Sequence, residues 1–258
     1  MWLVILGITN LVLLIFSLFF LLPKDSYKKI PSLLENIFQI INKNLIPLII
    51  IFFVVAFHLF EVKFIDPVVT ELIGHNYANI IVGFENGVVH WFSQNWTPGI
   101  LHFFVLIYIG IYPFTLWFSP LYFVFSDNKR ALKSLAYGLL LIYIFALPFY
   151  LFVPITNVYT YFNIDSALET VLPGVETFFY STTTMNNCLP SLHTAMTILI
   201  AYTVSLTGNK RLAYFSYFVM IFVIISVIYL SIHWITDVVT GGLLSLAVIF
   251  ILHRYIRN

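Results

Sequence analysis

The sequence predicts an all-α membrane protein, a polytopic bundle of about seven spanning helices. Of its 258 residues, 61% are hydrophobic and only 9% are charged, whereas about 25% of residues are charged in an average soluble domain. Apolar runs of roughly 20 residues, the length that crosses a bilayer as a helix, recur along the chain. The formal net charge of +1 provides no basic excess for binding nucleic acid, so no such partner is expected.

Seven apolar segments have the length and composition expected of spanning helices. The first follows the initial methionine without a basic region and lacks a small-residue cleavage signal, so we expect a retained helix. Pro113 and Pro120 lie inside the third, and a membrane helix tolerates them as kinks. The segments are residues 2–22, 45–59, 99–125, 131–153, 190–206, 212–232 and 238–253.

The stretch near residues 61–97 is interrupted by charged residues, Gly and Asn. Its weak helical pattern and several aromatic residues predict an outer interfacial or re-entrant element. We therefore expect one integral membrane domain with amino-terminal spans in residues 1–130 and the motifs described below in residues 131–258. The single cysteine, Cys188, excludes an internal disulfide.

Basic residues predict the orientation, because short cytoplasmic loops are enriched in Lys and Arg. With seven spans, only Lys63 falls on the side opposite the other basic residues. The amino terminus is therefore expected outside and the carboxyl terminus in the cytoplasm, in a plasma or cell membrane. The residues expected on the cytoplasmic side are Lys24, Lys28, Lys29, Lys43, Lys129, Arg130, Lys133, Lys210, Arg211, Arg254 and Arg257.

A polar loop passes through Pro190 into an apolar segment, and residues 187–193 read Asn-Cys-Leu-Pro-Ser-Leu-His. Proline suits the first turn of a helix, where its missing amide proton costs nothing. Ser191, Leu192 and His193 are then expected in that turn, whose free amides and positive dipole end favour an anion such as phosphate. Taken alone, the pattern more commonly marks a helix start with an interfacial histidine.

A second polar cluster, His233-Trp-Ile-Thr-Asp237, interrupts the apolar residues 212–253. One helix over this stretch would be about 63 Å long, so we expect the chain to turn near its middle. At positions i and i+4, His233 and Asp237 share one helical face. The carboxylate can then orient the imidazole and leave its second nitrogen as a nucleophile. Ionisable residues inside membrane segments are usually functional; a structural His–Asp pair is the open alternative.

Together the two motifs resemble those of the type 2 phosphatidic acid phosphatase (PAP2) superfamily, membrane enzymes related to vanadium haloperoxidases. That family carries Pro-Ser-x-His at one helix start and His-x3-Asp at a later one, as residues 190–193 and 233–237 do here. The chain looks most like the inositol phosphorylceramide synthase branch and its prokaryotic relatives. The features that carry this likeness are Cys188, the Leu in Pro-Ser-Leu-His where Gly is more usual, the aromatic residue after His233, and the pattern from Asp237 to Gly241. The resemblance covers about residues 131–253 and implies a six-helix core.

The resemblance implies an integral membrane lipid phosphotransferase or phosphatase, acting on a phospholipid or isoprenoid phosphate at the outer membrane face. In this scheme His233 attacks phosphorus and forms a phosphohistidine, Asp237 holds and polarises it, and His193 protonates the leaving oxygen. Ser191 and the backbone amide of Leu192 bind phosphoryl oxygens. The expected partner is a membrane lipid; the oligomeric state is left open.

The chain departs from the family's phosphatases in its cations. Those enzymes have Lys and Arg in an earlier motif and an Arg six residues before the nucleophile. In this chain the second of these positions holds Val227, and residues 134–209 contain no Lys or Arg. Lys63, the remaining outer cation, is a candidate phosphate contact. The losses favour a phosphotransferase. The alternatives are a plain lipid-phosphate or isoprenyl-pyrophosphate phosphatase, or a non-catalytic lipid-binding or transport protein with a degenerate site.

No metal or other cofactor is expected. Several histidines and carboxylates could approach the outer face, but their spacing matches no known type of metal site. These residues are Glu71, His75, Glu85, His90 and His102.

Overall fold

The computed structural model describes residues 2–23, 31 and 35–256, and over these residues the chain is helical, without β-strands. The predicted all-α membrane bundle is confirmed, because six helices are long and apolar enough to cross a membrane. They identify an integral membrane protein. The six are Trp2–Leu21, Leu45–Ile73, Pro98–Phe125, Lys129–Phe152, Lys210–Tyr229 and Ile235–Tyr255.

The second of these helices is longer than predicted, because it continues from residue 59 to Ile73. Two of its charged residues face the protein: the side chains of Glu61 and Asp66 are 0% and 3% exposed. Phe64 and Leu72, by contrast, face outward and are 55% and 80% exposed. The carboxylates of Glu61 and Asp66 therefore do not end the helix near residue 60, although Lys63 and Glu71 are exposed on it, and only the rest of the stretch near 61–97 leaves the long helix.

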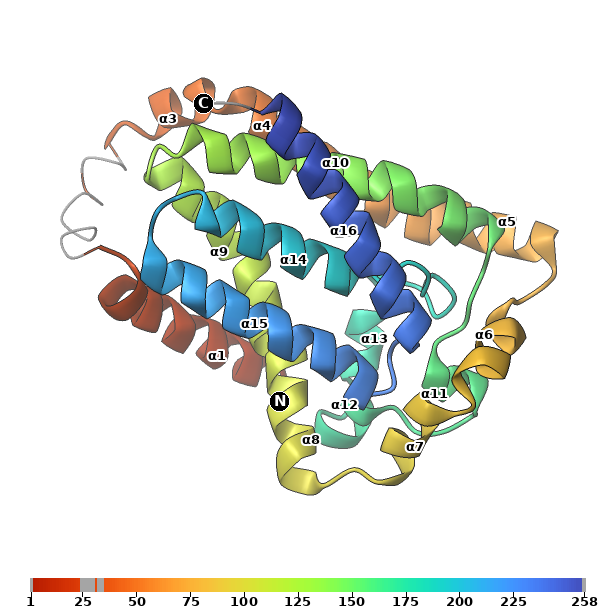
Figure 1. The fold of residues 1–258 in the computed structure, drawn as a ribbon. Helices are drawn as coiled ribbons and strands as arrows, with labels where there is room; N and C mark the ends of the chain where they lie inside the picture. The colour runs from red at the N-terminus through yellow and green to blue at the C-terminus, as the bar shows by residue number, and fades with distance from the viewer. Residues whose placement is uncertain (1, 24–30, 32–34, 257–258) are drawn as a thin grey trace.

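The amino-terminal half consists of long helices separated by short ones (Figure 1). Short π-helical segments, labelled η, continue three of the long helices. The elements are α1 (Trp2–Phe16), η1 (Ser17–Leu21), α3 (Ile37–Lys43), α4 (Leu45–Phe60), η3 (Glu61–Ile65), α5 (Asp66–Ile73), α6 (Ala78–Glu85), α7 (Val88–Gln94), α8 (Pro98–Val105), η4 (Leu106–Ile111) and α9 (Tyr112–Phe125).

The carboxyl-terminal half holds the bundle centre and a group of short helices at one end of it (Figure 1). Its elements are α10 (Lys129–Phe152), α11 (Val158–Tyr161), α12 (Ala167–Val171), α13 (Val175–Phe179), α14 (Leu192–Ser205), α15 (Lys210–Tyr229) and α16 (Ile235–Tyr255). The division of the chain at residue 130 stays a prediction.

The predicted span over residues 190–206 forms the central helix α14, which has 14 residues. At 1.5 Å per residue it is about 21 Å long, shorter than the six spanning helices. It packs against α10, α15 and α16, whose apolar side chains surround it. A short helix in the middle of the bundle places its first turn below the ends of its neighbours, so residues there are enclosed by protein.

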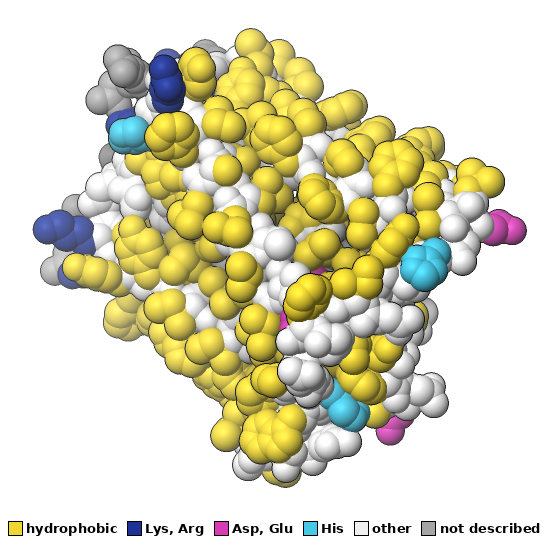
Figure 2. All heavy atoms as spheres, turned by 45° about the vertical axis from the view of Figure 1, so that its right-hand side comes forward, with side chains coloured by type: hydrophobic (Ala, Val, Ile, Leu, Met, Phe, Trp, Pro, Cys, Tyr) yellow, Lys and Arg dark blue, Asp and Glu magenta, His cyan; other side chains and the backbone are white. Residues whose placement is uncertain are grey.

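Charge is distributed unevenly along the bundle. Figure 2 shows Lys and Arg side chains at one end of the visible face, acidic side chains at the other, and hydrophobic side chains between them. This separation agrees with the predicted grouping of the basic loops, but the side of the membrane stays a prediction. Four of the residues used for that prediction, Lys24, Lys28, Lys29 and Arg257, lie outside the described residues.

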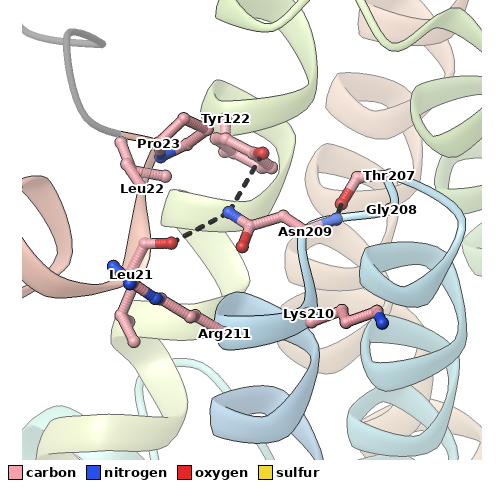
Figure 3. A pocket seen from close by; sticks show the side chains of 9 residues that line it. All are labelled: Leu21, Leu22, Pro23, Tyr122, Thr207, Gly208, Asn209, Lys210 and Arg211. Carbon is pink, nitrogen blue, oxygen red and sulfur yellow. Dashed lines mark hydrogen bonds between the residues drawn. The ribbon is translucent and has the colours of Figure 1, made fainter.

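A cavity of about 490 Å³ lies at the turn between α14 and α15 (Figure 3). The Asn209 side-chain amide donates to the Leu21 carbonyl oxygen (2.9 Å) and to the Tyr122 hydroxyl (3.3 Å), which ties this turn to two other helices. The cavity follows the carboxyl end of α14, whereas His193 lies in the first turn of that helix. It is therefore separate from the site described next.

Candidate active site

The first motif is held in place by its backbone. Helix α14 begins at Leu192, and the Ser191 hydroxyl caps it by accepting from the Thr194 amide (3.3 Å). The Ser191 amide donates to the Asp237 carbonyl oxygen (2.9 Å), and the Tyr150 hydroxyl donates to the carbonyl of the preceding proline (2.7 Å). The helix thus starts two residues later than Pro190, so the predicted proline in its first turn is wrong.

The second motif lies in a turn between two helices, as predicted. Helix α15 ends at Tyr229 and α16 begins at Ile235. Ser231, in the turn, adopts a left-handed conformation with φ of 56°. His233 precedes α16 and is not on its helical face. It still contacts Asp237, because that carboxylate turns back toward the helix start and also accepts from the Trp234 amide (2.9 Å).

The three predicted catalytic side chains meet in one hydrogen-bonded row. His233 Nδ1 lies 3.2 Å from Asp237 Oδ2, and His233 Nε2 lies 3.1 Å from His193 Nδ1. The row continues at His193 Nε2, which lies 2.8 Å from the Tyr108 hydroxyl. His233, Asp237 and Tyr108 are buried, and His193 is partly buried. The structure therefore brings together residues from η4, α14, the α15–α16 turn and α16.

The His233 imidazole is neutral at neutral pH. Burial lowers its pKa to about 3, although a hydrogen bond to the Cys188 backbone offsets part of this effect. Because the nitrogen facing Asp237 carries the proton, Nε2 has a free lone pair directed at His193. Such a nitrogen can act as a nucleophile without first losing a proton.

Cys188 lies beside the row, and ligand atoms of Cys188, His233 and Asp237 lie within 4.8 Å of one another. Burial, and secondarily the nearby Asp237, raises the pKa of the Cys188 thiol well above its usual value. A protonated thiol is a poor metal ligand and a weak nucleophile. The hydrogen bond between His233 Nδ1 and Asp237 Oδ2 occupies one possible ligand atom of each of these residues, so the arrangement fits acid–base chemistry better than metal binding.

Comparison with protein families decides the family of this chain. The sequence model of the PAP2 superfamily matches residues 77–251. The chain belongs to the PAP2 superfamily. The match begins at residue 77, well before residue 131, where the motif resemblance was placed. The comparison does not assign a branch within the superfamily, and searches of curated proteins and of solved structures found no match.

The PAP2 site has two helix amino termini, at α14 and α16, and only the first is open to an anion. At α16, both carboxylate oxygens of Glu85 are in use: one accepts from the Ile235 amide (3.1 Å), the other from the Thr236 amide and hydroxyl (2.7 and 2.8 Å). At α14, the amides of Leu192 and His193 precede the intrahelical ladder. This favours the α14 end for binding phosphate.

Two contacts to the PAP2 motifs, those of Glu85 and Tyr108, were not predicted from the sequence. Glu85 is at the end of α6 and lies 150 residues before the amide that it binds. Nothing in a single sequence pairs such distant residues. The π-helical conformation of η4, which carries Tyr108, is typical of functional positions, but it is visible only in the structure.

Glu85→Ala is expected to destabilise the protein and lower its turnover. It leaves two partly buried amides at the start of α16 unpaired, which costs up to about 1–3 kcal/mol, and it loosens the turn that carries His233. Thermal unfolding and kcat measure the two effects. Glu71→Ala, at an exposed glutamate of α5, is the matched control, and equal behaviour of the two variants would contradict the role given to Glu85.

Glu61 and Asp66 form a second buried acidic group near this PAP2 site. The Tyr143 hydroxyl donates to Glu61 Oε2 (3.1 Å), and Asn187, from the first motif, lies next to both carboxyl groups. Lys63, on the same π-helical segment, is exposed, with its ammonium 5.5 Å above the Phe64 ring. The predicted contact of Lys63 with phosphate stays a prediction.

Proposed function

We propose that this PAP2 protein is a lipid phosphotransferase that works through a phosphohistidine on His233. The observation that supports this most directly is the row of side chains in which Asp237 binds one nitrogen of His233 and leaves the other facing His193 at 3.1 Å. The substrate class is a phospholipid or isoprenoid phosphate. We further propose that the site faces the outer side of the membrane, as the basic loops predict.

In the first half-reaction, the Nε2 lone pair of His233 attacks phosphorus. The bond from phosphorus to the leaving oxygen breaks, and that oxygen takes the Nδ1 proton of His193 in its doubly protonated imidazolium form, which leaves His193 a neutral imidazole. In the second half, an acceptor hydroxyl gives its proton to His193 and attacks phosphorus, and the P–N bond breaks. Dividing one displacement into two in this way is the advantage of covalent catalysis. Binding of the phosphoryl group must therefore break the 3.1 Å contact between His193 and His233.

Phosphoryl oxygens are bound by the start of α14. The free amide of Leu192 and the positive end of the helix dipole face this position. The Ser191 hydroxyl accepts a hydrogen bond from the Thr194 amide, and the residue is fully buried. We therefore assign Ser191 to capping the start of α14. Electrostatic stabilisation of this kind usually contributes more to the rate than any other single effect.

The charge around the row favours a phosphate group with a single negative charge. The side-chain hydrogen bonds of His193 and His233 lead to Tyr108 and Asp237, and no Lys or Arg of the described chain is among their partners. A diester carries one negative charge and a monoester up to two, so a site without fixed cations suits the diester better. This supports a phosphotransferase of the inositol phosphorylceramide synthase-like branch over a plain phosphatase.

The test is a substrate screen on the purified protein in detergent. The substrates are 32P-labelled phosphatidic acid, a labelled phosphodiester phospholipid and an isoprenyl pyrophosphate. With at least one of them we expect turnover, and after quenching without acid a label on the protein that acid removes and base does not. A chelator should change neither result.

The same screen identifies the acceptor of the phosphoryl group and distinguishes the alternative functions. Release of inorganic phosphate from phosphatidic acid without added alcohol would identify a phosphatase, and transfer to an added alcohol identifies a phosphotransferase. Absence of both turnover and label with every substrate would contradict the proposal and favour a lipid-binding or transport protein, a function that would not need the missing cations.

A further inference from the structure

The Tyr108 hydroxyl reaches the nitrogen of His193 that faces away from His233. The distance from this hydroxyl to His193 Nε2 is 2.8 Å, and the two ring centroids are 4.9 Å apart. Tyr108 is 2% exposed and belongs to η4. Packing and the hydrogen bond together fix the His193 ring from the side opposite the reacting centre.

The directions of the hydrogen bonds follow from the carboxylate at the end of the row. An ionised Asp237 accepts only, so with this carboxylate His233 donates from Nδ1 and accepts at Nε2. His193 must then donate from Nδ1 toward His233, which leaves its Nε2 as an acceptor for the Tyr108 hydroxyl. Each member of the row thus has one defined role.

We propose that Tyr108 is a positioning residue that holds the protonated Nδ1 of His193 toward the leaving oxygen, both in the resting neutral ring and in the imidazolium that gives up this proton. The inference rests on the proposed function for the identity of that oxygen. A hydroxyl suits this position, because it donates to the neutral imidazole and accepts from Nε2 once the ring is protonated. Phenylalanine at position 108 keeps the ring packing and can do neither.

The neighbouring Tyr112 provides a matched control. It is also buried, and its ring centroid lies 5.4 Å from that of His193. Its hydroxyl, however, points to the Met196 sulfur, 3.9 Å away, rather than to His193. Tyr112→Phe removes a hydroxyl of equal size from the same helix while the bond to His193 Nε2 is retained.

The kinetic test compares two lipid phosphodiesters, one with an alkyl leaving group and one with p-nitrophenol, whose anion leaves without a proton. Tyr108→Phe is expected to lower the single-turnover rate of protein labelling roughly tenfold or more for the alkyl substrate, since positioned acids contribute about 10²–10⁴-fold, and less than about threefold for the other, whose leaving oxygen needs no proton. Tyr112→Phe is expected to show no such difference. Equal losses on both substrates, or an unchanged labelling rate with the alkyl substrate, would overturn the proposal.

A second measurement does not depend on turnover. The 15N shifts of the His193 ring, assigned with His193→Ala, report which nitrogen carries the proton. We expect Nδ1–H in the wild type and in Tyr112→Phe, and loss of that preference in Tyr108→Phe. An unchanged tautomer in Tyr108→Phe overturns the role of Tyr108. If the tautomer changes as expected but no lipid phosphate is turned over by the wild type, the proposed function fails and the contact stands.

Discussion

His233→Ala is expected to abolish turnover, with kcat lowered by roughly 10⁴-fold or more, the size of loss seen when a covalent nucleophile is removed. The variant removes the nitrogen that the Asp237 contact positions for attack. Cys188 cannot replace it, because its buried thiol has a raised pKa and stays protonated. Steady-state turnover of the substrate found in the screen, together with the label on the protein, measures the effect.

Two further variants separate the roles within the row. His193→Ala is expected to keep the label with a p-nitrophenyl substrate and to lose turnover with an alkyl one, because only the alkyl leaving oxygen needs a proton. His253→Ala is the control, since His253 is exposed near the end of α16 that is far from His233. Full activity in His233→Ala would contradict the mechanism.

The lowered pKa of His233 predicts how labelling of the protein responds to pH. A histidine loses its nucleophilic lone pair only when the pH falls below its pKa. Since burial lowers that pKa to about 3, His233 stays unprotonated between pH 5 and 8, whereas an ordinary histidine titrates near 6.5. Labelling of the protein should therefore show no loss attributable to His233 over this range; an acid limb near 6.5 that is caused by His233 would contradict the burial seen in the structure.

The sequence predicted the presence of the long apolar helices better than it predicted the residues at which they end. Long apolar runs determine spanning helices because the bilayer demands their length and composition. The boundary near residue 60 was wrong because a single sequence shows where charges occur but not where they point. Glu61 and Asp66 are turned inward and accept hydrogen bonds from protein groups, so they do not end the helix.

The site residues that belong to the two sequence motifs could be predicted, and the others could not. His193, His233 and Asp237 were found because local spacing and the family resemblance mark them, and the structure brings them together. Tyr108 and Glu85 were missed because their roles come only from tertiary contacts, 85 and 150 residues away in sequence. The Ser191 hydroxyl caps α14 by accepting from the Thr194 amide, and its predicted contact with phosphate stays a prediction.

Gly241 shows how closely the two motif-bearing helices approach each other. It lies on α16 one turn after Asp237, and a Cβ added there would be 2.4 Å from the Ser191 carbonyl oxygen. That oxygen belongs to the backbone at the start of α14, which a rotamer change cannot move away. The Ser191 amide also donates to the Asp237 carbonyl oxygen (2.9 Å), so the absence of a side chain at Gly241 sets the distance between the two motifs.

Gly241→Ala is therefore expected to push α16 away from α14 and to separate His233 from His193. Overpacking costs about 1–3 kcal/mol, partly offset by up to about 1 kcal/mol of helix propensity, and a displacement near 1 Å lowers kcat by about 10²-fold. Thermal unfolding and kcat measure both losses.

Gly242→Ala is the matched control, because its added Cβ meets only Ile198 Cδ1, at 3.9 Å, an ordinary contact. It gains the same helix propensity as Gly241→Ala without the backbone clash, so we expect equal or higher stability and normal turnover. The difference between the two variants isolates the helix approach from every effect of adding a methyl group to α16. If both behaved alike, the contact between Gly241 and Ser191 would not control the distance between His193 and His233.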